Sequence, residues 1–254
     1  MNEWNRDEFR LDQLPTGQWV GRFPAFERLA GLSHAVTTRS CGDFGAAHHG
    51  SDPAGFEFIR GLIGANGVAW AEHVHGTTVL LAEEAGRAGA ADGVMTHVPG
   101  LAVTAFSADC TDILIADPAA RAVGAIHAGW KGTANRGASS LVRAMVEHLG
   151  CNVADMVACL GPSIGPCCFY ANAEMETEVR ANYGSLAEAT LIPRKKNLAF
   201  DLWRANTLDL ESAGVKAENI HSSSLCTSCN VDLFFSWQKT LQKGTFCCAL
   251  ALTS

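Results

Sequence analysis

The sequence lacks the features that mark several large classes of protein. Its 254 residues include 19 Lys and Arg, which are scattered without a run, and the net charge is -7. Nucleic-acid binding needs a basic patch, so we expect no nucleic acid among the partners. No apolar stretch approaches the roughly 18 residues of a membrane span, and the N-terminus lacks the apolar core of a secretory signal. We therefore predict a cytoplasmic protein that has no membrane partner and acts on small molecules.

Phosphate-loop motifs and linkers are also missing. No GxGxxG or GxxxxGK[ST] pattern opens a helix after a strand, which disfavours a Rossmann fold. No repeat, low-complexity tract or linker rich in Pro, Gly or Ser divides the chain. Hydrophobic residues make up 48% of the sequence, which is enough for a sizeable core. We expect one domain that spans residues 1–254.

Strand and helix patterns alternate along the chain. Residues 113–116 and 122–126 are apolar runs joined by a loop too short for a parallel crossover, so they should form an antiparallel hairpin. Further strands are expected at residues 34–38, 77–81, 101–106, 156–160, 220–223, 233–237 and 246–250, and helices at residues 134–149, 174–183 and 201–213. This alternation predicts a mixed α/β (α+β) fold in which a mixed β-sheet is flanked by helices.

The chain contains 10 cysteines. A protein of this length in a reducing compartment does not need them as disulfides. We expect most of them to be reduced thiols. The vicinal pairs Cys167-Cys168 and Cys247-Cys248 are interpreted as small apolar fillers that point to opposite faces of a strand. Cys226 and Cys229 have the spacing of half a zinc ribbon, but no second CxxC completes four ligands. A structural or incidental role is therefore favoured for that motif.

Polar residues at positions 109–112 precede an apolar run, which is typical of a site at the mouth of a strand. A buried, apolar Cys110 is the alternative interpretation. The Cys110 thiolate and the neutral imidazoles of His75 and His127 are borderline-soft donors. Three such ligands leave the fourth position of a tetrahedral Zn²⁺ open for water. The sequence therefore indicates a catalytic metal site at these three residues.

Six short motifs occur in a fixed order along the chain: His73-Val-His75-Gly76, Ala91-Asp92-Gly93, Ala108-Asp109-Cys110, His127-Ala-Gly-Trp130-Lys-Gly132, Gly161-Pro-Ser-Ile-Gly165 and Phe234-Phe-Ser236. Together they resemble the multicopper polyphenol oxidase (laccase-domain) family, whose bacterial members are described as purine nucleoside phosphorylases. The resemblance implies a single α/β domain with a mixed sheet. It also implies a metal site made by His75, Cys110 and His127, the same three residues that the local chemistry indicates.

The resemblance implies phosphorolysis of adenosine, inosine and methylthioadenosine at a Zn²⁺ site, with adenosine deaminase activity beside it. Purine nucleosides and phosphate are then the expected small-molecule partners. Copper-dependent polyphenol oxidation is the alternative, with Cu²⁺ in place of Zn²⁺. The 9 histidines supply only His73 and His75 in HxH spacing, so one mononuclear ion is the most that we expect.

A further alternative is a metal-free hydrolase in which Cys110 is the nucleophile and His127 its base. Some members of the family have been assigned to peptidoglycan precursor editing, which such a hydrolase would fit. A nucleophile and its base have little use for a second imidazole, whereas a metal needs one. His75 therefore favours the metal site.

Each reaction asks for particular residues. Deamination needs a general acid or base near the metal, and Asp109 is the first candidate, ahead of Asp112. Phosphorolysis needs a cation to position phosphate, for which Arg39 and Lys131 are the candidates. Asp92, like Arg39 and Lys131, is predicted to bind substrate.

The chain departs from the family pattern at several arginine positions. Lys131 stands where Arg is usual, and the segments at residues 237–239 and 244–245 replace segments that contain Arg in the family. Lysine holds phosphate only as a point charge, without the bidentate fork of arginine. These departures predict a weaker affinity for phosphate.

Overall fold

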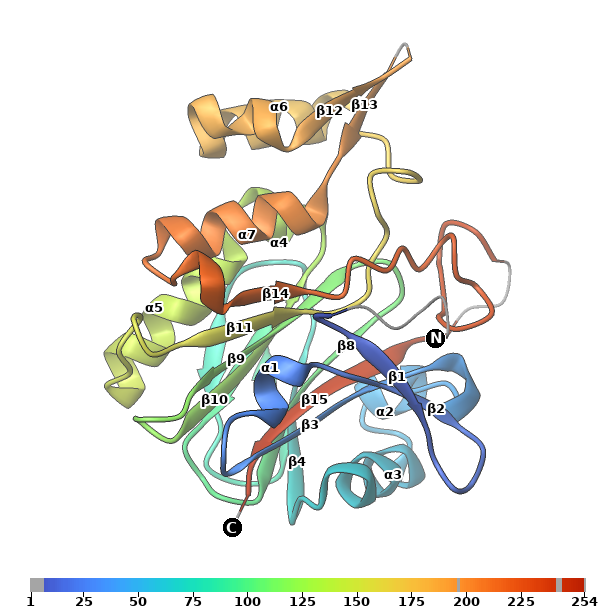
Figure 1. The fold of residues 1–254 in the computed structure, drawn as a ribbon, viewed down its shortest axis with the longest axis vertical. Coiled ribbons are helices and arrows are strands. Elements are labelled where there is room, and N and C mark those ends of the chain that lie inside the picture. Colours follow the sequence, from blue (N-terminus) through green and yellow to red (C-terminus); the bar gives the residue numbers. More distant parts are fainter. Residues whose placement is uncertain (1–6, 196, 241–243, 254) are drawn as a thin grey trace.

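The computed structural model describes residues 7–195, 197–240 and 244–253 of the chain (Figure 1). One sheet has seven strands, in the order β1 (Arg10–Gln13), β2 (Trp19–Arg22), β3 (Leu32–Thr37), β15 (Phe246–Leu252), β8 (Leu101–Ser107), β4 (Gly67–Glu72) and β6 (Gly86–Ala90). A second sheet has six, in the order β14 (Ile220–Ser222), β11 (Val157–Leu160), β9 (Thr111–Asp117), β10 (Ala122–Ala128), β7 (Gly93–Thr96) and β5 (Val79–Leu81). A separate hairpin is formed by β12 (Leu191–Arg194) and β13 (Asn197–Phe200).

Both large sheets are mixed. In the first sheet β4 runs parallel to β6 and β8, and in the second β11 runs parallel to β14 and β5 to β7. All other neighbours are antiparallel, including the predicted hairpin of β9 and β10. The predicted mixed α/β fold is confirmed, with two large sheets where the sequence indicated one.

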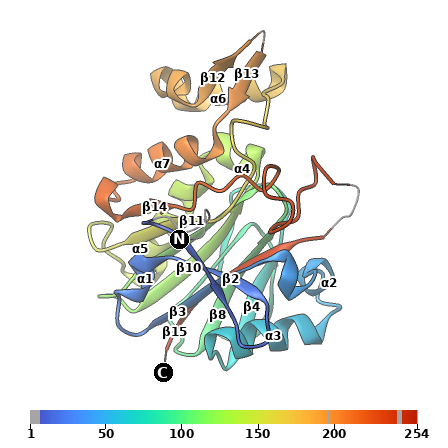
Figure 2. The same cartoon turned by 45° about the vertical axis from the view of Figure 1, so that its right-hand side comes forward.

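Helices cover the outer faces of the two sheets (Figures 1 and 2). Helix α3 (Pro53–Ile63) packs on β3, β4 and β15 of the first sheet, and α5 (Gly137–Leu149) packs on β5, β7 and β10 of the second, with α7 (Leu202–Ser212) against α5. The molecule therefore has the layer order helix, sheet, sheet, helix. The remaining helices are α1 (Pro24–Glu27), α2 (Gly45–His48), α4 (Trp130–Ala134) and α6 (Ala173–Tyr183), with short 3-10 turns η1 (Arg39–Cys41), η2 (Gly184–Ala189) and η3 (Ala217–Asn219).

The main core lies between the two sheets. Val103 and Leu250 of the first sheet belong to the same buried cluster as Leu114 of the second. Cys248 also belongs to this cluster, whereas its neighbour Cys247 belongs to the cluster on the α3 side. The interpretation of this vicinal pair as apolar fillers on opposite faces of a strand is confirmed.

Local sequence sets the ends of the main helices. The Asp52 side chain accepts a hydrogen bond from the Ala54 N–H at the start of α3, and Asp201 accepts one from the Arg204 N–H at the start of α7. Such caps satisfy backbone donors that have no partner within the helix. Gly150 ends α5 with φ of 66°, a left-handed conformation that favours glycine. The sequence predicted the end of α5 at Gly150 and the start of α7 at Asp201. It did not predict helix α3.

Two other expectations were wrong. The strand predicted at residues 233–237 is a series of turns, in which the Phe234 N–H donates to the carbonyl of Asn230. Phe234 is buried because it anchors a loop in the core rather than because a strand alternates there. The helix predicted at residues 134–149 is divided at Arg136, whose φ is 65°, into α4 and α5. In the described part of the chain, no helix has both the length and the apolar character needed to cross a membrane.

Candidate active site

His75, Cys110 and His127 come together in the structure. Each offers one donor atom, and these atoms lie within 4.8 Å of one another. Cys110 immediately precedes β9, and His127 lies in the neighbouring strand β10. His75 lies in the loop that leads from β4 of the first sheet to β5 of the second. The site therefore forms where the two sheets meet.

Asp92 holds the loop that carries His75. Its carboxylate accepts hydrogen bonds from the backbone N–H groups of Val74, His75 and Gly76 at 3.2, 2.8 and 2.6 Å. His75 has φ of 57°, a left-handed conformation that is uncommon outside glycine. The three bonds to Asp92 stabilise this conformation and so fix the direction of the imidazole.

Asp112 orients His127. The register of the β9–β10 hairpin places the two residues opposite each other, and Nδ1 of His127 lies 3.1 Å from Oδ1 of Asp112. The Ser107 hydroxyl donates to the second oxygen of Asp112 at 3.0 Å. A carboxylate that receives the proton of one ring nitrogen fixes the tautomer of a metal-binding imidazole. The other nitrogen, Nε2, is buried and has no hydrogen-bond partner among the described residues.

Charge at the site favours a cation. Burial lowers the pKa of His127, but the negative charges of Cys110 and Asp112 outweigh burial and raise it to about 10. A bound metal would take the place of this proton, because an imidazole must be deprotonated to bind a metal. Burial and the charge of His127 lower the pKa of His75, which favours the neutral imidazole that a metal requires.

Gly129 keeps the space between two of the donors open. A Cβ at this position would lie 3.1 Å from the Cys110 Sγ and 3.1 Å from the His75 Nδ1. The nitrogen and sulfur donors, the orphaned Nε2 of His127 and this open space all fit a tetrahedral ion such as Zn²⁺.

The three donors face a cavity of about 720 Å³. Small-molecule sites are typically of this size and largely apolar. Aromatic side chains form much of the wall, namely those of Phe106, Trp130, Phe169 and Trp237. Polar lining comes from Asp43, His49, His73, Ser107, Asp109, Gln238 and Thr245.

Asp109, predicted as the general acid or base, lines this cavity with both carboxylate oxygens engaged. Oδ1 accepts a hydrogen bond from the Thr227 hydroxyl at 2.6 Å, and Oδ2 accepts one from the Gln238 N–H at 2.8 Å. Asp109 has φ of 92°, a strained conformation for a residue other than glycine. In this structure Asp109 anchors two loops beside Cys110.

The three residues predicted to bind substrate do not lie on the cavity wall. The Arg39 guanidinium lies 4.9 Å from the ring centroid of Phe235. The Lys131 ammonium lies 3.6 Å from the Glu174 carboxylate. Asp92 holds the His75 loop, as described above. Among the described residues that line the cavity, none is Lys or Arg.

In the sequence, His73 belongs to the HxH pair and to the first of the six motifs, and no role in the site was predicted for it. Its ring stacks on that of His127, with centroids 4.2 Å apart and planes inclined by 16°. His73 also lines the cavity. Its spacing of two residues from His75 was the available signal.

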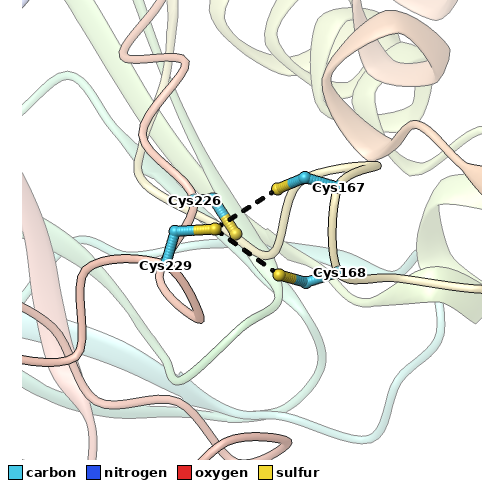
Figure 3. A group of neighbouring side chains, drawn as sticks. All are labelled: Cys167, Cys168, Cys226 and Cys229. Atoms are coloured by element: carbon cyan, nitrogen blue, oxygen red, sulfur yellow. Dashed lines mark hydrogen bonds between the residues drawn. The ribbon is translucent and has the colours of Figure 1, made fainter.

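A second group of candidate ligands consists of Cys167, Cys168, Cys226 and Cys229, whose Sγ atoms also lie within 4.8 Å of one another (Figure 3). We call it the four-thiol cluster. The interpretation of the vicinal pair in this cluster as apolar fillers in a strand is wrong. Cys167 is exposed, and both members of the pair lie in a turn. The pair supplies the two thiols that a second CxxC would have supplied.

Comparison with known proteins identifies relatives that match most of the chain. A family model described as "Multi-copper polyphenol oxidoreductase laccase" matches residues 57–253. "Purine nucleoside phosphorylase PA4543" of Pseudomonas aeruginosa is 30% identical over 236 residues, which cover 88% of this chain and 94% of that protein. The crystal structure of "Bacillus licheniformis hypothetical protein YfiH" superposes with a TM-score of 0.85 at 25% identity, and covers 98% of this chain and 100% of that one.

Other relatives match over part of their length. "Purine nucleoside phosphorylase LACC1" of Homo sapiens is 38% identical over 149 residues, 57% of this chain and 34% of the human protein. The match thus spans about a third of that relative. "Adenosine deaminase RL5" of an unknown prokaryotic organism is 34% identical over 146 residues, 57% of this chain and 55% of that protein.

Proposed function

The chain belongs to the multi-copper polyphenol oxidoreductase laccase family, and on that basis we propose that it is a zinc-dependent enzyme of purine nucleosides. One proposed reaction is phosphorolysis, in which phosphate displaces the purine from the ribose and ribose 1-phosphate forms. The other is deamination of adenosine, in which water replaces the amino group and ammonia leaves. The convergence of His75, Cys110 and His127 on one cavity carries this proposal.

His75, Cys110 and His127 would hold the ion, with one position left open. Zn²⁺ in such a site acts as a Lewis acid and lowers the pKa of a bound water to about 7. Asp112 keeps the proton on Nδ1 of His127, so that Nε2 is directed away from the carboxylate. Asp92 fixes the loop of His75. These two carboxylates therefore prepare the ligands before any substrate enters.

The aromatic wall suits a purine. Phe106, Trp130 and Phe169 line the cavity and offer flat apolar surfaces on which a heterocyclic base can stack. We expect the base to lie against this wall and the ribose to lie near the three metal ligands.

Phosphorolysis makes a further demand on the site. Phosphate needs cationic or N–H donors, and the described residues of the cavity wall include no Lys or Arg. Deamination uses water and makes no such demand. The lack of a cation among the described wall residues favours a low affinity for phosphate, which the replacement of the family's arginines also predicts. Deamination should then account for more of the adenosine turnover than phosphorolysis does.

Two alternatives fit less well. Oxidation of phenols at several copper ions would need several clusters of ligands that contain His. Among the described residues only His75, Cys110 and His127 form one. A metal-free hydrolase would use Cys110 and His127 alone, whereas the donor atom of His75 lies within 4.8 Å of both. This second imidazole supports a metal ligand set.

The test is the turnover of adenosine, with and without phosphate, together with the metal content of the wild type, Cys110→Ala and Cys41→Ser. Cys41 is half-buried and lies outside both groups of ligands, so Cys41→Ser is the control. We expect Cys110→Ala to lose turnover and one equivalent of metal, and Cys41→Ser to lose neither.

Three outcomes would change the proposal. Full turnover by Cys110→Ala would contradict the site. Loss of turnover with unchanged metal content would favour a nucleophilic Cys110. Release of inosine without free base, at any phosphate concentration, would leave deamination and remove phosphorolysis.

A further inference from the structure

The four-thiol cluster lies outside the cavity described above, and none of its residues lines that cavity. The Sγ of Cys229 lies 3.5 Å from the Sγ of Cys167 and 3.5 Å from that of Cys168 (Figure 3). In a tetrahedral site with Zn–S bonds of about 2.3 Å, neighbouring sulfurs lie about 3.8 Å apart. We propose that the four-thiol cluster is a second metal site, which binds Zn²⁺ through four thiolates.

Two turns present the thiols to one point. Cys226 and Cys229 lie in a turn closed by a hydrogen bond of 3.2 Å from the Cys229 N–H to the Cys226 carbonyl. This CxxC spacing is usual for half of a structural zinc site. The second turn is closed by the Cys168 N–H, which donates to the Gly165 carbonyl at 2.9 Å. Figure 3 shows the side chains of Cys167 and Cys168 leaving this turn toward the opposite one.

Backbone hydrogen bonds hold the two turns side by side. The Ser163 N–H donates to the Leu225 carbonyl at 3.2 Å, and the Thr227 N–H donates to the Ser163 carbonyl at 3.0 Å. These bonds place the two turns in a fixed register. The ligands are therefore positioned in advance, which lowers the entropic cost of binding an ion.

Gly165 supports one of the sulfurs directly. Its N–H donates to the Cys226 Sγ at 3.2 Å. A backbone donor to sulfur stabilises the thiolate form, and such outer contacts are typical of metal ligands. Gly165 also has no room for a side chain, since a Cβ would lie 2.6 Å from Cη2 of Trp203 and 3.3 Å from Cβ of Cys226.

A single ion accounts for all four thiols, whereas a disulfide does not. A disulfide joins only two sulfurs, at about 2.05 Å, whereas the Cys229 Sγ lies 3.5 Å from both the Cys167 Sγ and the Cys168 Sγ and can form a disulfide with only one of them. Binding Zn²⁺ converts four thiols to thiolates and releases their protons to solvent, with no change of oxidation state. Four protein ligands leave no open position, so this ion would be structural.

The second metal site would stabilise the segment that carries Cys110. Thr227, beside Cys226, donates its hydroxyl to Oδ1 of Asp109 at 2.6 Å. The Ile164 N–H donates to the Asp109 carbonyl at 2.8 Å. Both turns of the four-thiol cluster thus continue directly into contacts with the residue that precedes Cys110. The inference itself does not depend on the proposed reaction.

The test counts metal on protein prepared under reducing conditions and loaded with Zn²⁺ or Co²⁺. We expect two equivalents per chain in the wild type and in the control Cys41→Ser, and one in Cys110→Ala. The Co²⁺ form of Cys110→Ala should retain the intense thiolate-to-cobalt absorption of a tetrathiolate site. The double variant Cys167→Ser/Cys229→Ser changes two exposed residues and should lose that absorption together with one equivalent.

The wild type and Cys110→Ala decide the matter even if the double variant does not fold. Cys110→Ala protein that binds no Zn²⁺ would overturn the second site. So would an intact mass that shows a disulfide within the four-thiol cluster under the same conditions. A wild type that binds one ion, retained in Cys110→Ala with the tetrathiolate absorption, would support the second site and contradict the metal centre of the proposed function.

Discussion

The two groups of ligands are built on different principles. The group of His75, Cys110 and His127 has three donors, faces a cavity, and is held by the buried carboxylates of Asp92 and Asp112. The four-thiol cluster has only sulfur donors, lies on turns, and has two exposed members. Three donors leave a position for a reacting molecule, and four do not. The difference suggests that supporting carboxylates and an open position accompany chemistry, whereas backbone bonds between turns suffice for a structural ion.

The largest effect should come from Asp112→Asn. The change keeps the shape of the side chain but removes the charge that orients His127. Loss of such a contact typically costs up to about 100-fold in metal affinity or activity. We call the group of His75, Cys110 and His127 the three-donor site. We expect a loss of this size in turnover and in the Zn²⁺ affinity of this site, measured by steady-state kinetics and by chelator competition. The cobalt absorption of the four-thiol cluster should not change.

The exposed Asp155→Asn is the matched control for that change and should leave both sites intact. The comparison between the two sites breaks down if Asp112→Asn weakens the four-thiol cluster as much as the three-donor site.

Acid tests both sites, but it also acts on a buried histidine that belongs to neither. His34 accepts a hydrogen bond from the Phe23 N–H at Nε2, and burial, with the positive charges of Arg22 and Arg10, lowers its pKa to about 3. Because the pKa is lower in the folded state, stability is complete above the unfolded value of about 6.5 and falls as the pH drops toward 3. The expected loss at pH 5 is about 2 kcal/mol.

His34→Gln keeps an acceptor for Phe23 but does not titrate. Unfolding in urea at pH 7 and pH 5 should therefore show a smaller loss of free energy for this variant than for the wild type. Equal losses in the two proteins would mean that groups other than His34 cause the acid sensitivity. The variant thus separates protonation of His34 from protonation of all other groups.

A smaller effect is expected for Gly129→Ala. The backbone of Gly129 is extended, with φ of -64°, so alanine is allowed there, but its Cβ would press on Cys110 and His75. A displacement of a few tenths of an ångström in these ligands should reduce turnover by about tenfold. Steady-state kinetics measure the loss, and the melting temperature should change little. Unchanged kinetics would show that the three-donor site is not limited by this contact.

The smallest effect is expected for Gly61→Ala, which serves as a control for the glycine change. Gly61 lies in α3, and a Cβ there would meet nothing within 4 Å. Replacing an exposed helical glycine by alanine raises stability by about 0.5–1 kcal/mol. We expect that gain in urea unfolding, with both metal sites and turnover unchanged. A loss of stability would mean that α3 does not pack as described.

Part of this arrangement could be predicted from the sequence. The donor types of His75, Cys110 and His127 indicated their role, and the short loop after residue 117 indicated the hairpin. The register of that hairpin pairs Asp112 with His127, so the sequence could have predicted that Asp112 orients this imidazole. The left-handed conformation of His75 could not be predicted, because it depends on three backbone hydrogen bonds to Asp92, which lies in the connection between β6 and β7.

The rest depends on contacts between distant parts of the chain. Cys168 and Cys229 are 61 residues apart and meet only because two turns are paired by their backbones. The division of the strands into two sheets was also hidden. Strands such as β8, β9 and β15 are buried along their whole length, and so lack the alternation that would indicate which face meets which layer. The wrong prediction of a strand at residues 233–237 has a related cause. An apolar residue such as Phe234 that is buried in a loop gives the same sequence pattern as one that is buried in a strand.

The β9–β10 hairpin has a consequence for the order of folding. Asp112 and His127 are 15 residues apart, and contacts that are local in sequence form sooner than those between distant segments. His75 lies in the connection between the two sheets and reaches its position when they pack together. A newly made chain should therefore carry an aligned imidazole early and complete its donor set late, so that metal uptake becomes one of the last events of maturation.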